Sequence, residues 1–139
     1  MPFTSAFHHL GVLCHHAEAA SRSFVVTFGY TPDGPVLNLP GLDIRARSLS
    51  ASGKPTVELI QPLKADSSLG RMLAAGTTGY HLAWSVPDLD QALTQGAHDG
   101  FHALPVFTSP LWNGARCAFI LDETQALFEL IENPPQENP

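Results

Sequence analysis

Apolar and polar positions along the chain follow a pattern that occurs twice. Residues 7–12 and 79–84 are short apolar stretches, and each carries a His-Leu pair at the same place. Residues 57–60 and 128–131 are later apolar runs, and each contains one acid. The two histidines lie 72 residues apart and the two acids 71 residues apart. This self-similarity predicts a chain built from two repeated modules.

Helical spacing follows the first strand of the first module. Ala20, Phe24 and Phe28 recur at intervals of four residues, which places them on one face of a helix. Gly29 follows directly and is typical of a helix end. The pattern therefore predicts a helix over residues 17–28.

The second module carries its own helix signal. Asp88 is a favourable N-cap, and Gln91 stands three residues later, as in a capping box. Leu89 and Leu93 then supply an apolar stripe. A helix over residues 88–97 is expected.

Strand signals follow each helix. Residues 115–121 and 126–131 are apolar runs separated by four polar residues, which predicts a hairpin. In the first module, residues 42–49 form a strand candidate, and a polar turn leads to the strand at 56–60. The order in each module is βαβββ, and the predicted fold class is α+β.

The segment between the modules and the end of the chain have different patterns. Residues 63–78 form a linker in which Asp66 or Ser67 is suited to cap a short helix. Residues 133–139 are rich in proline and lack apolar side chains, so we expect this tail to fray.

Length and composition indicate a single domain. The chain has 139 residues, of which 44% are hydrophobic and 14% charged, an ordinary globular balance. We therefore expect one domain over residues 1–132, with modules at about 7–62 and 79–132.

Cys14 and Cys117 are too few for a disulfide framework and are expected to be buried thiols.

The charge of the chain excludes two classes of partner. The formal net charge is −6, with only seven Lys and Arg residues, whereas nucleic acids and anionic membranes are recognised through basic patches.

The N-terminus has no signal-peptide pattern, and no apolar run reaches the ~20 residues that span a bilayer. We expect a cytoplasmic protein with a small-molecule substrate.

The two acids of the repeat predict a metal site. Glu58 and Glu129 lie in mostly apolar strands, where a buried carboxylate must be protonated, paired or bound to a metal. The repeat adds His9 and His81 at equivalent positions. One divalent ion held by these four residues explains both acids at once. Imidazole and carboxylate together suit cobalt, nickel, manganese, zinc or iron, and the sequence does not choose among them.

The remaining histidines and the tryptophans receive other roles. His8 points to the opposite face of its strand from His9. Trp112, in a loop, is the candidate for lining a substrate pocket, whereas Trp84 is also compatible with core packing. The histidines not expected to bind metal are His8, His15, His16, His98 and His102.

As an ordered set, these motifs resemble the vicinal-oxygen-chelate superfamily, which includes glyoxalases, bleomycin resistance proteins and dioxygenases. Within it, the chain is most similar to methylmalonyl-CoA epimerases. The matching motifs, within about residues 7–132, are His-Leu-Gly at 9–11, Glu-Leu-Ile-Gln-Pro-Leu at 58–63, Asp-Ser-Ser at 66–68, Gly-Tyr-His-Leu-Ala at 79–83, Val-Pro-Asp-Leu at 86–89 and Phe-Glu-Leu-Ile-Glu at 128–132.

The resemblance implies a fold and a reaction. The fold is an eight-stranded cupped sheet made from the paired βαβββ modules, in a homodimer. The metal inside the cup chelates two neighbouring substrate oxygens and stabilises an enolate after a proton leaves the adjacent carbon. Glu129 and Glu58 are the candidate catalytic carboxylates, with Glu129 as ligand and base. The implied activity is that of an epimerase or isomerase acting on an acyl thioester of the methylmalonyl-CoA type.

Three other activities of the superfamily are alternatives. Glyoxalase I enzymes carry an Arg and an Asn for glutathione where this chain has Leu13 and Pro62. Ring-cleaving dioxygenases use two His and one Glu and have no acid equivalent to Glu58. Resistance proteins that bind drugs without a metal lack the four ligands altogether.

Two departures from the epimerase pattern concern the substrate. Tyr80 replaces a histidine that usually precedes His81. Where epimerases carry a further acid before the Glu-Leu strand, this chain offers only Asp43. Arg45 and Arg47 follow it and are candidates for binding a substrate carboxylate or phosphate, although an exposed strand edge explains them equally well.

Overall fold

The computed structural model describes residues 2–135 and has the α+β fold class, with ten strands and three α-helices in that range. The chain divides into an N-terminal unit, residues 9–81, and a C-terminal unit, made within the described range by residues 2–8 and 82–135. The strands are β1 (Ala6–Leu13), β2 (Thr31–Pro32), β3 (Leu37–Leu39), β4 (Ile44–Ala51), β5 (Lys54–Pro62), β6 (Gly79–Val86), β7 (His102–Ala103), β8 (Phe107–Ser109), β9 (Ala115–Leu121) and β10 (Leu127–Glu132). The helices are α1 (Ala17–Phe28), α2 (Ser68–Ala74) and α3 (Leu89–His98), with 3-10 turns η1 (Pro40–Leu42) and η2 (Pro110–Trp112).

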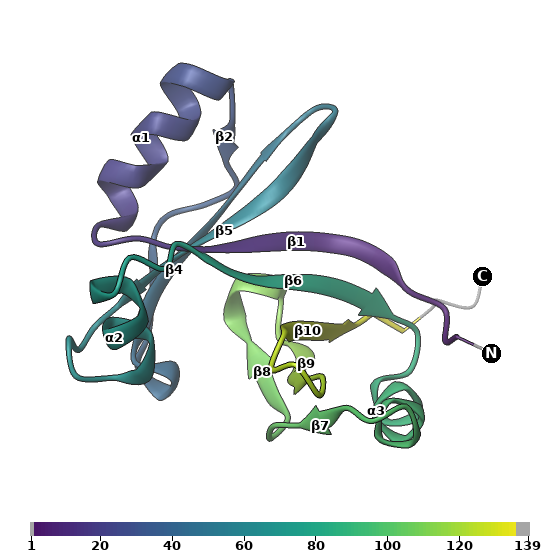
Figure 1. Ribbon diagram of the computed structural model, residues 1–139. Coiled ribbons are helices and arrows are strands. Elements are labelled where there is room, and N and C mark those ends of the chain that lie inside the picture. Colours follow the sequence, from purple (N-terminus) through teal and green to yellow (C-terminus); the bar gives the residue numbers. More distant parts are fainter. Residues whose placement is uncertain (1, 136–139) are drawn as a thin grey trace. The chain divides into compact units, whose positions relative to one another are not determined.

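The N-terminal unit contains a sheet in the order β2, β4, β5, β1, and β3 also pairs with β4. The β1–β5 pair is parallel and the other pairs are antiparallel. In Figure 1, α1 lies alongside β2 and β5. Leu49, Val57, Leu59 and Tyr30 are buried on this side of the sheet, and the partly buried Phe24 packs against them. One face of the sheet is therefore packed by α1.

The C-terminal unit repeats this topology. Its strands follow the order β6, β10, β9, β7, and β8 also pairs with β9. The β6–β10 pair is parallel, as β1–β5 is in the other unit. The core beside α3 contains Leu89, Ala92, Ala118, Ile120 and Leu130. The repeat predicted from the sequence is thus present as two copies of one strand arrangement.

The two predicted helices lie within one residue of their expected bounds. The helix expected over 17–28 is α1, and Gly29 follows it with a left-handed φ of 73°. The helix expected near 88–97 is α3, whose N-cap Asp88 accepts a hydrogen bond from the backbone N–H of Gln91 at 3.0 Å. In the linker, Ser67 rather than Asp66 caps α2.

The number of strands exceeds the expected eight because each module has a divided edge strand. β2 and β3 both pair with β4, and β7 and β8 both pair with β9. Pro35 interrupts the first pair and Pro105 the second. Proline lacks the N–H that a strand ladder needs, so it is tolerated at such edges and divides them.

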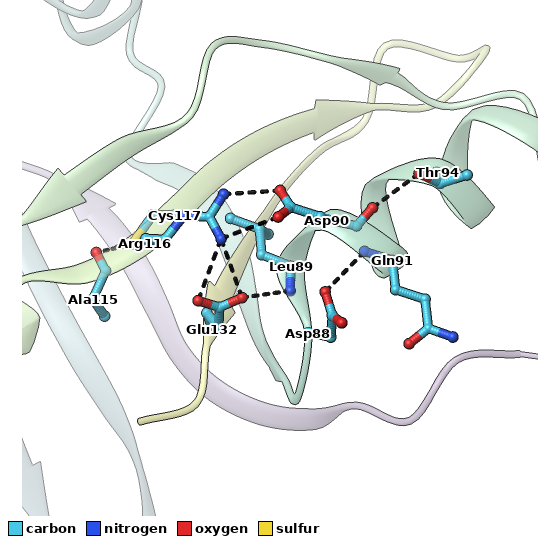
Figure 2. A network of polar contacts seen from close by, with 9 residues as sticks. All are labelled: Asp88, Leu89, Asp90, Gln91, Thr94, Ala115, Arg116, Cys117 and Glu132. Carbon is cyan, nitrogen blue, oxygen red and sulfur yellow. Dashed lines mark hydrogen bonds and ion pairs between the residues drawn. The ribbon is translucent and has the colours of Figure 1, made fainter. Parts of the chain in front are cut away.

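A polar network fastens α3 to the strands of the C-terminal unit (Figure 2). Arg116 of β9 contacts Asp90 of α3 at 2.8 Å and Glu132 of β10 at 3.4 Å. Glu132 also accepts a hydrogen bond from the backbone N–H of Leu89 at 2.8 Å. One arginine therefore connects three elements of this unit.

Three further expectations concern thiols, membranes and the tail. Cys117 is buried and Cys14 half-buried, and neither forms a disulfide. Among the described residues, no helix combines the length and the apolar character needed to cross a membrane. Part of the tail expected to fray, residues 136–139, lies outside the described residues.

Candidate metal site

Three of the four predicted ligands come together in the N-terminal unit. His9 lies on β1, Glu58 on β5 and His81 near the start of β6. His9 Nε2 is 3.0 Å from His81 Nε2 and 3.2 Å from Glu58 Oε2. Each of these residues offers a ligand atom within 4.8 Å of the other two. The set therefore has the compactness that a single ion requires.

Strand pairing brings these residues together. The parallel register of β1 and β5 places Gly11 opposite Glu58, so His9 is two residues away on the same face of β1. The backbone N–H of Leu13 donates to the carbonyl of Thr78 at 2.7 Å, just before β6 begins. Glu58 on β5 and His81 at the start of β6 therefore lie on either side of β1, which carries His9.

The burial of the three candidate ligands favours a metal site rather than an ordinary cluster of polar residues. The exposed fractions are 0% for His9, 7% for Glu58 and 4% for His81. Removing a carboxylate from water costs several kcal/mol unless a cation or hydrogen-bond donors compensate. Two imidazoles and a carboxylate are also a donor set that divalent transition metals favour. The residues present fit a divalent ion.

Gly11 provides the space that His81 occupies. A Cβ atom at residue 11 would lie 2.3 Å from His81 Cε1 and 2.5 Å from His81 Nδ1. These separations are far shorter than a van der Waals contact, so only glycine at this position lets the imidazole lie against β1. The His-Leu-Gly motif therefore combines a ligand with the clearance for a second ligand.

Glu129 occupies the corresponding position in the C-terminal unit. It is buried on β10 and lies opposite Ala83, two residues after His81. Glu58 likewise lies opposite Gly11, two residues after His9. The neighbouring residue Leu130 packs in the α3 core, so Glu129 projects from the face away from α3.

Arg45 and Arg47 lie on the other face of their sheet from Glu58. Ser48 of β4 pairs directly with Glu58, whereas Arg47 pairs with Leu59 of the α1 core. Arg45 forms an ion pair with Glu18 of α1 at 3.0 Å. The structure thus places both arginines on the α1 side and does not bring them to the candidate ligands.

Asp43 is not directed at the candidate site either. It follows η1 with a left-handed φ of 53°, is exposed, and lies 3.8 Å from Lys64 Nζ. The residues of β4 that share a face with Glu58 are Ile44, Ala46 and Ser48. The strand before the Glu-Leu strand therefore offers a hydroxyl, not a carboxylate, on that face.

Ser48 connects this face to an exposed carboxylate. Its hydroxyl donates to Asp33 Oδ2 at 3.0 Å, and the hydroxyl of Ser50 donates to Asp33 Oδ1 at 2.6 Å. Ser48 is buried, whereas Asp33 is exposed. Asp33 consequently lies at the rim of the Glu58 face.

Trp112 lines a cavity in the C-terminal unit. The cavity has a volume of about 380 Å³, and its wall includes His8, Arg116, Ile131 and Glu132. The rings of His8 and Trp112 meet edge to face with centroids 4.7 Å apart. Trp112 therefore lines a cavity and contacts His8, and its contact with a substrate stays a prediction.

Charged and thiol groups elsewhere have shifted pKa values with clear causes. The hydrogen bond and charge of Arg116 lower the pKa of Asp90, and Asp90 in turn raises the pKa of Arg116. Burial raises the pKa of the Cys14 thiol, which therefore stays protonated at neutral pH. Hydrogen bonds from Thr124 and the Ala126 backbone lower the pKa of Asp122 in the β9–β10 turn.

The sequence reasoning did not assign roles to Gly11 or Asp33. A glycine inside a strand is a recognised sign that another group approaches the backbone closely, so the sequence alone could have singled out Gly11. No sequence pattern singles out Asp33, because its place beside Ser48 depends on the pairing of the short strand β2 with β4.

Comparison with known proteins agrees with this architecture. A hypothetical protein from Bacillus halodurans C-125 superposes with a TM-score of 0.82 at 19% identity, covering 98% of this chain and 99% of that one. Methylmalonyl-CoA epimerase from Mycobacterium tuberculosis gives a TM-score of 0.80 at 22% identity, covering 93% of this chain and 88% of that one. These likenesses show a shared fold.

Sequence comparison gives a more direct assignment. The uncharacterised protein YwkD of Bacillus subtilis is 28% identical over 130 residues, which cover 91% of this chain and 96% of that protein. The profile of one superfamily matches residues 8–119, most of the chain. The chain therefore belongs to the Glyoxalase/Bleomycin resistance protein/Dioxygenase superfamily.

Proposed function

We propose that this protein is a metal-dependent enzyme that moves a proton at a carbon next to a carbonyl group. The observation that carries the proposal is the buried group of His9, Glu58 and His81, whose ligand atoms lie within 4.8 Å of one another. A divalent ion bound there supplies Lewis-acid polarisation of a substrate oxygen, which stabilises the negative charge that develops when a proton leaves the neighbouring carbon.

Glu129 is assigned as the fourth ligand and as the proton acceptor. Its support is its place in the repeat, because β10 holds it in the register that β5 gives Glu58. It is also buried, on the face away from α3. Its carboxylate takes the proton from carbon and passes it to solvent, and Glu58 and the two imidazoles would hold the divalent ion.

The substrate class proposed is an acyl thioester of the methylmalonyl-CoA type. The support comes from solved proteins of the same fold, which include a methylmalonyl-CoA epimerase in complex with methylmalonyl-CoA. A glutathione substrate is less suited to this chain, because Leu13 is an apolar side chain with an exposed fraction of 1% and Pro62 has no polar side-chain atom. Trp112 is proposed to contact the substrate from its cavity.

Isotope exchange tests the reaction. In deuterated water, the metal-loaded protein should label methylmalonyl-CoA at its acidic carbon, and the chelated protein should not. Glu129→Gln should slow labelling by the ~10²-fold typical of general-base catalysis. The hemithioacetal of methylglyoxal and glutathione is the comparison substrate, and its turnover without labelling of the thioester would replace the proposal with a glyoxalase activity.

Metal content is the independent test of the site. Protein purified without chelator should contain close to one divalent ion per chain, measured by elemental analysis. Protein that contains no metal and takes none up on titration would contradict both the site and the reaction. Cleavage of a catechol by the iron-loaded protein, with no labelling of thioesters, would instead indicate a dioxygenase.

A further inference from the structure

A row of residues runs across the sheet of the N-terminal unit on the Glu58 face. Gly11 of β1 lies opposite Glu58, and Glu58 lies opposite Ser48 of β4. Pro32 of β2 pairs with Leu49, so the next residue, Asp33, falls beside Ser48. The Asp33 carboxylate is thus the outer end of a row that begins at the candidate ligands.

The Asp33 carboxylate is held in place but keeps capacity to bind. Ser48 and Ser50 each donate one hydrogen bond to a different carboxylate oxygen, at 3.0 and 2.6 Å. The backbone N–H of Asp33 donates to the carbonyl of Ser48 at 3.0 Å. An ionised carboxylate has about four acceptor sites, so two remain. In the described part of the chain, the ion pairs of Lys and Arg involve other acids.

Distance decides what this carboxylate can do. Neighbouring strands are about 4.8 Å apart, so Asp33 lies roughly 10 Å from Glu58 across two strand spacings. A proton-transfer group must come within about 3 Å of the atom that gives up the proton. A carbon one bond from a carbonyl held at the His9–Glu58–His81 group is beyond that reach. Asp33 is therefore suited to recognition of a more distant part of the substrate.

We propose that Asp33, oriented by Ser48 and Ser50, is a specificity-determining residue that binds an amide N–H of the substrate. This inference rests on the proposed function. A carboxylate only accepts hydrogen bonds, so it selects a donor and repels phosphate or carboxylate at the same place. The arm of an acyl thioester formed with pantetheine carries amide N–H groups a few bonds beyond the sulfur. Such an arm, extended from the metal-bound end, presents a donor at the rim where Asp33 lies.

The test compares two substrates with the wild-type protein and with two variants at Asp33. One substrate is the methylmalonyl thioester of N-acetylcysteamine, and the other is a thioester of equal length in which a methylene replaces the amide nitrogen. The wild-type protein should have about a tenfold lower KM for the first in the exchange assay, with similar kcat. Asp33→Ala should remove this preference, whereas Asp33→Asn, whose amide oxygen still accepts a hydrogen bond, should only weaken it.

Asp43→Ala is the matched control, because Asp43 is an exposed acid of the same unit that lies off the Glu58 face. It should keep the tenfold preference. Equal KM values for both substrates with the wild-type protein, or an unchanged preference in Asp33→Ala, would overturn the assignment of Asp33.

A binding experiment separates this inference from the proposed reaction. Pantetheine itself should bind to the wild-type protein, detected by saturation-transfer NMR, and should bind at least about tenfold more weakly to Asp33→Ala. This result without any thioester exchange would reject the reaction and keep the amide-binding role. Absence of pantetheine binding to the wild-type protein, or equal binding to both forms, would reject the role of Asp33 even if exchange is observed.

Discussion

A buried group in the N-terminal unit and an exposed network in the C-terminal unit use ionisable side chains in different ways. In the N-terminal unit, His9, Glu58 and His81 are almost fully buried. In the C-terminal unit, the side chains of Arg116 and Asp90 in the network of Figure 2 are 39% and 74% exposed. Exposed ion pairs contribute about 0–1 kcal/mol and cost little to form, whereas buried ionisable groups carry a large desolvation penalty. The buried group is therefore the candidate for metal binding, whereas the exposed network fastens α3 to the strands of its unit.

Removal of one buried ligand should give the largest effect. His81→Ala or Glu58→Gln should weaken metal binding by orders of magnitude, because a site that loses one of its ligands retains an ion poorly. Isothermal titration with a divalent metal measures the change. His8→Ala is the control, since His8 contacts Trp112 in the other unit. Equal losses from His8→Ala and His81→Ala would mean that the alternation along the strands has been assigned incorrectly.

Gly11→Ala should damage the same site without changing a ligand. The added Cβ would meet the His81 ring at 2.3 Å, so the imidazole must shift. We expect at least a tenfold loss of metal affinity and a fall in the free energy of unfolding of about 1–3 kcal/mol, the usual cost of overpacking. Urea unfolding and metal titration give the two quantities.

Gly79→Ala is the matched control for this substitution. Gly79 also lies in a strand and is two residues from His81, but a Cβ there would meet no atom within 4 Å. It should leave metal affinity unchanged and stability unchanged or slightly raised. Similar damage from both substitutions would show that the effect comes from the backbone of these strands rather than from the space for His81.

Removal of the α3 N-cap should have a moderate effect in the other unit. Asp88→Ala deletes the acceptor for the Gln91 N–H and should lower the free energy of unfolding by about 1 kcal/mol. Metal affinity should not change. Asp66→Ala, an exposed acid beside the cap residue of α2, should be close to neutral in the same urea titration. A loss of metal affinity in Asp88→Ala would contradict the view that the attachment of α3 and the candidate metal site are independent of each other.

Much of the fold could be predicted because its signals are local. The caps at Asp88 and Gly29 and the helical spacing before Gly29 depend on residues within one or two turns. The repeat gave the strands that carry His9 and Glu58. The divided edge strands could not be predicted, because strands of only two or three residues are too short to show the alternation of apolar and polar side chains. Proline also interrupts each edge.

The parts of the site that depend on register could not be predicted. The alternation within one strand does not reveal which face meets α1, so Arg45 and Arg47 were candidates for the substrate until the pairing of β4 with β5 placed them on the α1 face. Asp33 became visible only through its hydrogen bonds to Ser48 and Ser50. The assignments of Glu129 to the metal and of a homodimer to the protein stay predictions.

Titration of Asp90 should show the smallest effect and the clearest cause. Arg116 holds the pKa of Asp90 below its usual value, chiefly through a hydrogen bond to the carboxylate. The contact therefore adds stability above the ordinary pKa of an aspartate, and this contribution is lost as the pH falls through the lowered pKa. Arg116→Met should raise the pKa of Asp90 toward that ordinary value, measured by carbon NMR of the carboxyl group. Arg45→Met, which breaks an ion pair in the N-terminal unit, should leave the pKa of Asp90 unchanged. If Arg116→Met does not move it, the close contact between Arg116 and Asp90 drawn in Figure 2 is absent in solution, and attachment of α3 depends on its apolar core and on the hydrogen bond from the Leu89 N–H to Glu132.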